Sequence, residues 1–267
     1  MHVSDPMELI VGETMTKVAD STYTSNTGIK QYTDEISNVR VIIPALNEEK
    51  NLEFLLTKLE ALGYSDILVI DGKSTDRTVA VAKKLGAKII LQKSNGKGDA
   101  IREVLKNECM NVDALVFMDA DGSMDPKEIP IFIRRLKSGA DIVKGSRFLK
   151  GGYTHDMSLF RRIGNRFFVS MVNLLFSTKY SDLCYGFWVF NRRTAKLISP
   201  LLKSQNFEIE TEIFVKAKKL GLKVIEVPST EFKRKSGKSN LNAFKDGFKI
   251  LQTVFREVIS HNFNRCF

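Results

Sequence analysis

The sequence predicts an α/β fold, in which helices flank a parallel sheet within a single domain. Short apolar runs alternate with amphipathic stretches, most of them ten or more residues long. Such alternation requires crossover connections, which place parallel strands side by side. The length of 267 residues and the hydrophobic content of 43% suffice for one sizeable core. In a sheet of this kind, ligands bind beyond the carboxyl ends of the strands.

The first 37 residues are rich in Ser, Thr, Asp and Asn and show no helical or strand period. We interpret them as a flexible polar N-terminal extension. Six acidic and two basic residues give residues 1–38 a charge of −4. The remaining residues therefore carry a charge of +14, and the net charge of the chain is +10. A body this basic favours anionic partners, namely phosphates, nucleic acid or an acidic membrane surface.

The strand and helix alternation occupies residues 39–147. Strands are predicted at 39–45, 67–70, 88–91, 114–118 and 142–144. Helices are predicted at 48–62, from a cap at 74–76 to residue 85, from 96 to about 108, and at 126–137. The helix at 48–62 places four leucines on one side, which indicates a face packed on the sheet.

After residue 147 the regular alternation ends. A loop at Gly151-Gly152 precedes a helix at 159–176, a strand at 184–190, a helix at 208–220 and a strand at 223–227. A basic loop at 233–238 then leads to a helix at 241–259. The helices at 159–176 and 241–259 each carry an apolar stripe beside basic residues. Such a stripe is either part of the core or the face of a helix lying in a membrane interface.

Two aspartates follow the apolar run that ends at Met118. Asp119 and Asp121 are two residues apart, so on an extended chain their carboxylates point to the same side. Together they form a D-x-D pair that suits one hard cation, Mg²⁺ or Mn²⁺. The alternative is a solvated strand end, because Asp121-Gly122 is also a common turn sequence.

Further polar motifs fall at the same predicted edge of the sheet. They are Pro44 to Asn47, Asp71 and Gly145 to Arg147. Gly96-Lys97-Gly98 opens a predicted helix and could cradle phosphate there. It is no Walker P-loop, because Gly98 stands where Ser or Thr is required.

The cysteines and the apolar runs bound the cellular setting. Cys109, Cys184 and Cys266 are an odd number without C-x-x-C spacing, which argues against a disulfide framework and a zinc site. No segment resembles a signal peptide or a transmembrane span. We expect a cytoplasmic protein whose contact with a membrane, if any, is peripheral.

Taken in order, five motifs resemble those of family 2 glycosyltransferases. They are Pro44 to Glu49, Asp71 to Asp76, Gly96 to Gly98, Asp119 to Gly122 and Gly145 to Arg147. The chain is most similar to the polyprenyl-phosphate sugar synthases, such as dolichyl-phosphate mannose and glucose synthases. The resemblance covers roughly residues 39–240. It implies a GT-A (Rossmann-like) fold with a mixed, mostly parallel sheet, a nucleotide-sugar donor, Mg²⁺ or Mn²⁺, and inversion at the anomeric carbon.

The resemblance also implies site residues by position. Donor-binding residues would be Pro44, Ala45, Leu46, Asn47, Glu48, Asp71, Lys97, Asp119, Ala120 and Asp121. Asp71 would face the base and Glu48 the ribose, while Asp119 and Asp121 would hold the metal. Cations on the phosphates would be Arg147, Arg161, Arg162, Arg234 and Lys238, for which ordinary surface charge is the alternative.

Two positions depart from the family pattern. Ser123 stands where several relatives have a third metal-proximal side chain, often Gln, and Trp188 follows Gly186-Phe187 where they often have a basic residue. Water would then take the place of the Gln ligand. The catalytic candidates are Asp121, Arg147 and Glu210.

The acceptor decides whether a catalytic base is needed. A hydroxyl must lose a proton as it attacks, whereas a phosphate monoester is already largely dianionic at neutral pH. The abundance of basic residues after position 147 favours the phosphate. Candidate bases for a hydroxyl are Asp182, Glu208, Glu210 and Glu212.

These observations predict transfer of a hexose or N-acetylhexosamine from a UDP- or GDP-sugar to a polyprenyl (dolichyl) phosphate. The product would feed protein glycosylation or cell-surface glycan synthesis. The alternative is a soluble family 2 enzyme that uses a carboxylate base on a hydroxyl of a glycan or small molecule. A nucleic-acid-binding module is disfavoured, because the basic residues are not interleaved with aromatic ones. We divide the chain into the extension, a catalytic domain at 38–240 and a C-terminal amphipathic helix at 241–267, a candidate for contact with an acidic membrane surface.

Overall fold

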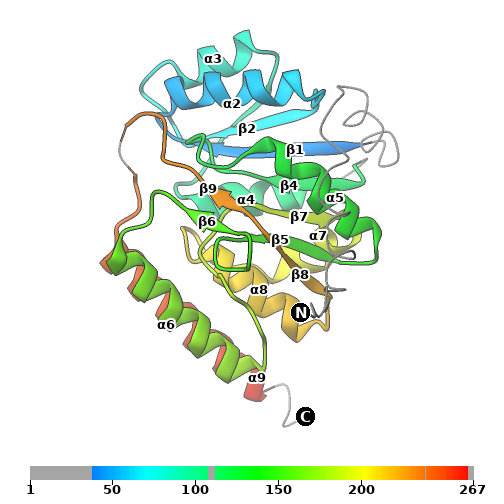
Figure 1. The fold of residues 1–267 in the computed structure, drawn as a ribbon, viewed down its shortest axis with the longest axis vertical. Coiled ribbons are helices and arrows are strands. Elements are labelled where there is room, and N and C mark those ends of the chain that lie inside the picture. Colours follow the sequence, from blue (N-terminus) through cyan, green and yellow to red (C-terminus); the bar gives the residue numbers. More distant parts are fainter. Residues whose placement is uncertain (1–37, 108–111, 238, 264–267) are drawn as a thin grey trace, which may run out of the picture.

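The computed structural model describes residues 38–107, 112–237 and 239–263 (Figure 1). The N-terminal extension, Cys109, Cys266 and Lys238 therefore lie outside the described residues. The side chains of residues 261–263 are outside it as well.

A seven-stranded sheet forms the centre of the molecule, with the order β3-β2-β1-β4-β7-β5-β8. Its strands are β1 Val39–Ala45, β2 Ile67–Asp71, β3 Lys88–Leu91, β4 Ala114–Phe117, β5 Ile142–Ser146, β7 Trp188–Asn191 and β8 Val224–Pro228. Only β7 runs antiparallel to its neighbours, so the predicted mixed, mostly parallel sheet is confirmed. Because β7 is reversed, its N-terminal end lies beside the carboxyl ends of the parallel strands.

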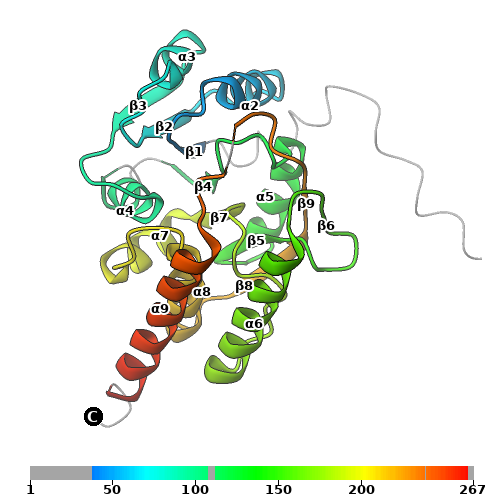
Figure 2. The same cartoon turned by 90° about the vertical axis from the view of Figure 1, so that its left-hand side faces the viewer.

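Helices cover both faces of the sheet (Figures 1 and 2). They are α2 Glu49–Ala61, α3 Thr78–Lys84, α4 Lys97–Asn107, α5 Ile129–Lys137, α6 Leu159–Phe176, α7 Arg192–Ile198, α8 Ile209–Lys219 and α9 Ala243–Phe263. Successive residues of β1 show the two layers. Val41 and Ile43 pack with α2, α3 and α5, whereas Ile42 packs with α4 and α6 to α9. Both faces are buried, which explains the continuous apolar strands.

Three local predictions need correction. The predicted helix at 126–137 is a 3₁₀ turn, Pro126–Glu128, followed by α5, because Asp125 caps the turn by accepting from the Lys127 N–H at 3.1 Å. The strand expected at 184–190 begins only at Trp188, and the residues before it form a loop. The sequence signals also missed α7 and a small parallel pair, β6 Tyr153–Thr154 with β9 Thr230–Glu231.

The loop at 74–76 differs in part from the predicted helix cap. Asp76 accepts from the Thr78 N–H at 2.9 Å just before α3, but the N-cap residue is Arg77, which makes no side-chain cap hydrogen bond. Ser74 and Thr75 instead bind Asn47, which lies in the loop after β1. These two residues tie neighbouring loops together at the edge of the sheet.

The long helices α6 and α9 lie side by side and project from the sheet (Figure 2). The core interpretation of their apolar stripes is wrong, since most of these side chains are exposed. On α6, the buried face consists of Asn165, Val169, Val172 and Phe176. The exposed stripe comprises Leu159, Phe160, Ile163, Phe167, Leu174 and Leu175 on α6, and Phe244, Phe248, Phe255 and Ile259 on α9. Among the described helices, none is long and apolar enough to cross a membrane.

Candidate active site

A cavity of about 780 Å³ opens at the carboxyl edge of the sheet and continues between α6 and α9. Most of the residues that the sequence predicted for the site border it. They are Pro44, Ala45, Leu46, Glu48, Lys97, Asp119, Ala120, Asp121, Arg147, Arg161, Glu210 and Arg234. The polar end lies at the ends of β1 and β4, as expected for a sheet of this topology.

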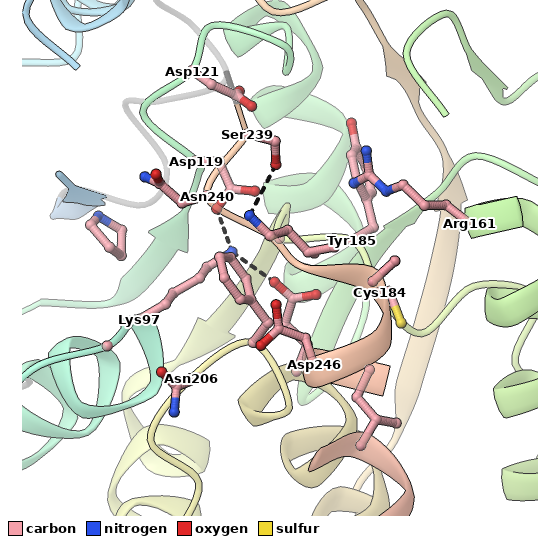
Figure 3. A pocket seen from close by; sticks show the side chains of 18 of the residues that line it. Lys97, Asp119, Asp121, Arg161, Cys184, Tyr185, Asn206, Ser239, Asn240 and Asp246 are labelled. Atoms are coloured by element: carbon pink, nitrogen blue, oxygen red, sulfur yellow. Dashed lines mark hydrogen bonds and ion pairs between the residues drawn. The ribbon is translucent and has the colours of Figure 1, made fainter. Parts of the chain in front are cut away.

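Lys97 joins two carboxylates in the floor of this cavity (Figure 3). Its Nζ forms ion pairs with Asp119 and with Glu210, the latter at 2.7 Å. Burial would lower the pKa of Lys97, but the two carboxylates outweigh it and raise that pKa. Burial, together with the negative charge of Asp119, raises the pKa of Glu210 although Lys97 acts to lower it. The Asp119 side chain remains 33% exposed and faces the cavity.

The glycines around Lys97 allow close packing against a neighbouring loop. A Cβ on Gly98 would lie 2.5 Å from the carbonyl oxygen of Ser204, so the start of α4 must press against the loop at 204–206. In addition, the Asp99 N–H donates to the Gln205 carbonyl at 3.1 Å. The Asp99 N–H is thus already bound, and phosphate binding by Gly96 to Gly98 stays a prediction. Gly96, Lys97 and Ala100 all border the cavity.

Arg234 links the second aspartate to the loop after β1. Its guanidinium donates to Glu48 at 2.8 Å and lies 3.6 Å from Asp121. Ser236 accepts a hydrogen bond from Asn51 at 3.0 Å. The segment from β9 to α9 therefore crosses this end of the cavity and is fastened to α2.

The donor set offered by the two aspartates fits a hard divalent cation. Asp119 and Asp121 both border the cavity, and Asp121 is oriented by the Ser123 N–H, which donates to its Oδ1 at 3.0 Å. Nowhere in the described ranges do three or more His, Cys, Asp or Glu side chains gather as a metal cluster. Two carboxylates leave most positions of an octahedral cation to other oxygens, which is how Mg²⁺ binds next to phosphates.

Arg147 borders the cavity, but its guanidinium is engaged in the protein interior. It forms a two-point ion pair with Asp182 at 2.7 and 2.9 Å, and it lies 3.0 Å from Glu231. Burial would lower the pKa of Arg147, and the pair with Asp182 instead raises it. With a side chain that is 1% exposed, Arg147 braces the loop after β5 against the loop before β7. A direct contact of Arg147 with phosphate stays a prediction.

Three predicted site residues within the described part of the chain do not border the cavity. Asn47 braces the loop at 74–75, and Arg162 packs over the Phe148 ring at 5.9 Å. Asp71 is buried at the end of β2, beside the cavity residues Ile70 and Gly72. Lys238 lies outside the described residues. Of the two neighbouring arginines, Arg161 is the one at the cavity (Figure 3).

The four candidate bases differ in their hydrogen-bond and ion-pair partners and in whether they border the cavity. Asp182 pairs with Arg147, while Glu208 accepts from the N–H groups of Gln205 and Asn206. Glu212 pairs with Arg256 at 2.7 Å and binds the backbone of the loop at 203–204. Of the four carboxylates, Glu210 is the one that borders the cavity.

Loop residues that the sequence signals missed complete the cavity wall. Tyr185 and Gly186 come from the loop before β7, Asn206 and Phe207 precede α8, and Asp246 lies in the first turn of α9. Gly186 allows a close approach, since a Cβ there would lie 2.6 Å from an oxygen of Asp119. Cys184 also borders the cavity, and burial raises the pKa of its thiol to about 12, so it is no nucleophile at neutral pH.

Comparisons with known proteins agree with this geometry. The sequence model of glycosyl transferase family 2 matches residues 40–198. The glycosyltransferase AglJ of Haloferax volcanii is 30% identical over 227 residues, which cover 84% of this chain and 73% of AglJ. The dolichol-phosphate mannosyltransferase of Pyrococcus furiosus is 32% identical over 228 residues, 82% of this chain and 63% of that protein.

A solved structure shows the same fold. Glucosyl-3-phosphoglycerate synthase from Mycobacterium tuberculosis, crystallised with Mn²⁺, UDP-glucose and phosphoglyceric acid, superposes with a TM-score of 0.70 at 18% identity. The superposition covers 90% of this chain and 86% of the synthase.

Proposed function

Because this chain belongs to glycosyltransferase family 2, we propose that it transfers a sugar from a nucleotide sugar to a polyprenyl phosphate, with inversion at the anomeric carbon. The GT-A fold that the sequence motifs imply is confirmed. Assignment to the hexosyltransferases also follows from family membership. The acceptor is the new element of the proposal.

The observation that carries the proposal is the shape of the cavity. Its polar end contains Asp119, Asp121 and Lys97, and its wall then follows two turns of α6 and of α9. This second part is lined by Phe160, Phe167, Phe168, Phe244, Phe248 and Leu251. A substrate with a phosphate head and an isoprenoid tail matches both parts, whereas a sugar or a small polar acceptor leaves the apolar part unused.

The exposed stripe on α6 and α9 supports the same acceptor. Leu174 is 82% exposed and Phe244 78%, which is unusual for side chains of this size. Arg162, Arg166 and Lys245 are exposed on the same two helices. Apolar and basic residues together suit the interface of an anionic membrane, so a lipid tail would reach the cavity directly from the bilayer.

The protein's own groups divide the chemistry between donor and acceptor. An oxygen of the acceptor phosphate attacks the anomeric carbon as the bond from that carbon to the donor diphosphate breaks. The acceptor loses no proton, so no base is needed. Arg161 and Arg234 border the cavity and would hold the phosphates, while Lys97 stays positive at neutral pH.

Asp119 and Asp121 would hold Mg²⁺ or Mn²⁺ at the donor diphosphate. When bound, the cation stabilises the negative charge that develops on the leaving diphosphate. Asp121→Asn keeps the shape of the side chain and its contact with the Ser123 N–H. We therefore expect this variant to fold normally and to lose transfer activity by at least about a hundredfold.

The acceptor is tested by incubating the protein with Mn²⁺ and labelled UDP- and GDP-sugars, with three alternative acceptors. These are a short polyprenyl phosphate, the matching polyprenol and phosphoglycerate. We expect product only in the reaction in which the polyprenyl phosphate is the acceptor. Transfer to polyprenol or phosphoglycerate at a similar rate would overturn the proposed acceptor. Normal transfer by Asp121→Asn would overturn the metal site.

A second candidate function rests on the position of Glu210 in the cavity wall. A carboxylate there would suit a family 2 enzyme that deprotonates a hydroxyl acceptor. Its raised pKa is compatible with a base, but its ion pair with Lys97 at 2.7 Å holds the carboxylate in place. The polyprenol arm of the experiment distinguishes this candidate from the first.

A further inference from the structure

The side of α6 that faces α9 contains a gap at Gly164. Phe160, Gly164 and Phe168 follow one another at intervals of four residues, so they lie in one row along α6. At one end of the row, the ring of Phe160 lies 4.9 Å from the ring of Phe244 on α9. At the other end, the Phe168 ring would lie 3.7 Å from a Cβ at Gly247 of α9. Between these two contacts, a Cβ at Gly164 would meet nothing within 4 Å.

This gap connects the apolar part of the cavity with the exposed stripe. Both aromatic contacts and Gly164 itself border the cavity, and Gly164 is half-buried. Ile163 and Phe167, which lie beside the gap on α6, are exposed members of the stripe, as is Phe248 on α9. A chain that passes through the gap therefore leads from the cavity to the face that we expect to contact lipid.

The polar end of the cavity is close to the same gap. Arg161 borders the cavity and precedes Gly164 by three residues, so it lies on the same side of α6. If Arg161 holds the acceptor phosphate, the hydrocarbon chain attached to that phosphate starts within about one helical turn of the gap.

We infer that Gly164 forms the portal through which the isoprenoid chain of the acceptor passes between α6 and α9. This inference rests on the proposed function and deepens it, because the size of the side chain at position 164 then determines which acceptor tails are used. Between Phe160 and Phe168 the helix rises by about 12 Å, which leaves room for a hydrocarbon chain between the two aromatic contacts. The rings at both ends of the gap offer apolar surface to that chain.

The helix itself gains nothing from a glycine at this position. Gly164 is an interior residue of α6, where only proline is a poorer helix former than glycine. Leu is among the best helix formers, so Gly164→Leu should fold at least as well as the wild type. Its side chain would, however, fill the gap between the aromatic contacts and exclude the isoprenoid chain.

The test compares Gly164→Leu with Ser170→Leu, which adds the same side chain elsewhere on α6. Ser170 is exposed and is not among the described residues that border the cavity. Both full-length variants are assayed with Mn²⁺, the nucleotide sugar that the wild type uses, and farnesyl phosphate, whose chain is long enough to pass the gap. We expect Gly164→Leu to lose at least about tenfold in kcat/KM and Ser170→Leu to match the wild type.

Two further measurements distinguish a portal from a structural role. Dimethylallyl phosphate has a single isoprene unit and ends before the gap. Its inhibition constant against farnesyl transfer should agree between the wild type and Gly164→Leu within about twofold. The affinity for UDP and GDP, measured by calorimetry with Mn²⁺, should be the same in both proteins.

Two results would overturn the inference while the proposed function stands. One is farnesyl transfer by Gly164→Leu at the rate of Ser170→Leu. The other is a loss of nucleotide affinity or of dimethylallyl phosphate inhibition that equals the loss of farnesyl transfer. If the wild type uses neither farnesyl phosphate nor a longer polyprenyl phosphate, the proposed function itself fails.

Discussion

Lys97 and Glu210 meet at 2.7 Å beneath the cavity, although 113 residues separate them in the chain. Lys97 begins α4, and Glu210 lies in the first turn of α8. Because Lys97 also pairs with Asp119, one ammonium group balances two buried or half-buried carboxylates. The arrangement orients Asp119 toward the cavity, as a metal ligand requires.

Replacing Lys97 with Met should therefore disturb both carboxylates. Without the ammonium group, Asp119 and Glu210 repel each other and favour protonation. We expect transfer to fall by about a hundredfold or more and the Mn²⁺ affinity to fall with it, measured by activity and calorimetry. Lys73→Met is the matched control, because the Lys73 ammonium group contacts Asn95 in an exposed position. Equal losses in both variants would contradict this role of Lys97.

The Glu210→Gln variant distinguishes two roles of Glu210, that of a carboxylate that positions Lys97 and that of a catalytic base. Gln can still accept the hydrogen bond from Lys97, so with a phosphate acceptor we expect a loss of less than about tenfold. If Glu210 were a catalytic base, the variant would instead lose activity by about 10²- to 10⁴-fold.

The pH dependence of kcat for this variant provides an independent measurement. A base acts when deprotonated, so the raised pKa of Glu210 would move the acid limb of the profile to higher pH, and Glu210→Gln would remove that limb. If the acceptor phosphate sets the limb, it lies near the second phosphate pKa of about 6 and persists in the variant. Disappearance of the limb would favour a hydroxyl acceptor.

Gly186 is required beside Asp119 for steric reasons. A Cβ at this position would lie 2.6 Å from one carboxylate oxygen of Asp119 and 2.7 Å from Lys97 Nζ. We expect Gly186→Ala to displace both groups and to weaken Mn²⁺-dependent nucleotide binding by about tenfold or more. Gly164→Ala also adds a methyl group to the cavity wall, but nothing lies within 4 Å of it, so its nucleotide affinity should match that of the wild type. Wild-type binding by Gly186→Ala would show that the methyl group is accommodated.

The sequence predicted the strands well because their signal is local. The apolar run from Ala114 to Phe117 is buried on both faces, and such runs are identified without any knowledge of their neighbours. The same is true of α6, whose predicted bounds agree with the structure. The direction in which its apolar stripe points was not predictable, because the amphipathic period is the same for a core helix and an interfacial one.

The site was predicted in part for a similar reason. Asp119 and Asp121 follow a strand in a recognisable motif, whereas Tyr185 and Asn206 are in loops without a local signal. Arg147 illustrates the opposite case. The family resemblance implies that it contacts phosphate, but its partner Asp182 is 35 residues away, and no local pattern predicts that pair.

The exposed stripe on α6 and α9 leads to the last prediction, which concerns binding to membranes. Phe248 and Ile259 are 59% and 60% exposed on α9, about three turns apart. Replacing both with Ser should weaken binding to vesicles that contain anionic lipid by about tenfold or more, because each side chain would contribute about 1 kcal/mol on partial burial. Flotation with the vesicles measures this binding. Leu91→Ser is the matched control, since Leu91 is 65% exposed on β3, away from both helices.

Binding to neutral vesicles should be weaker and less sensitive to salt, because the exposed arginines and lysines of the two helices then have no anionic partner. If the double variant binds anionic vesicles as well as Leu91→Ser does, the stripe is not the membrane contact and the apolar part of the cavity must fill from solution.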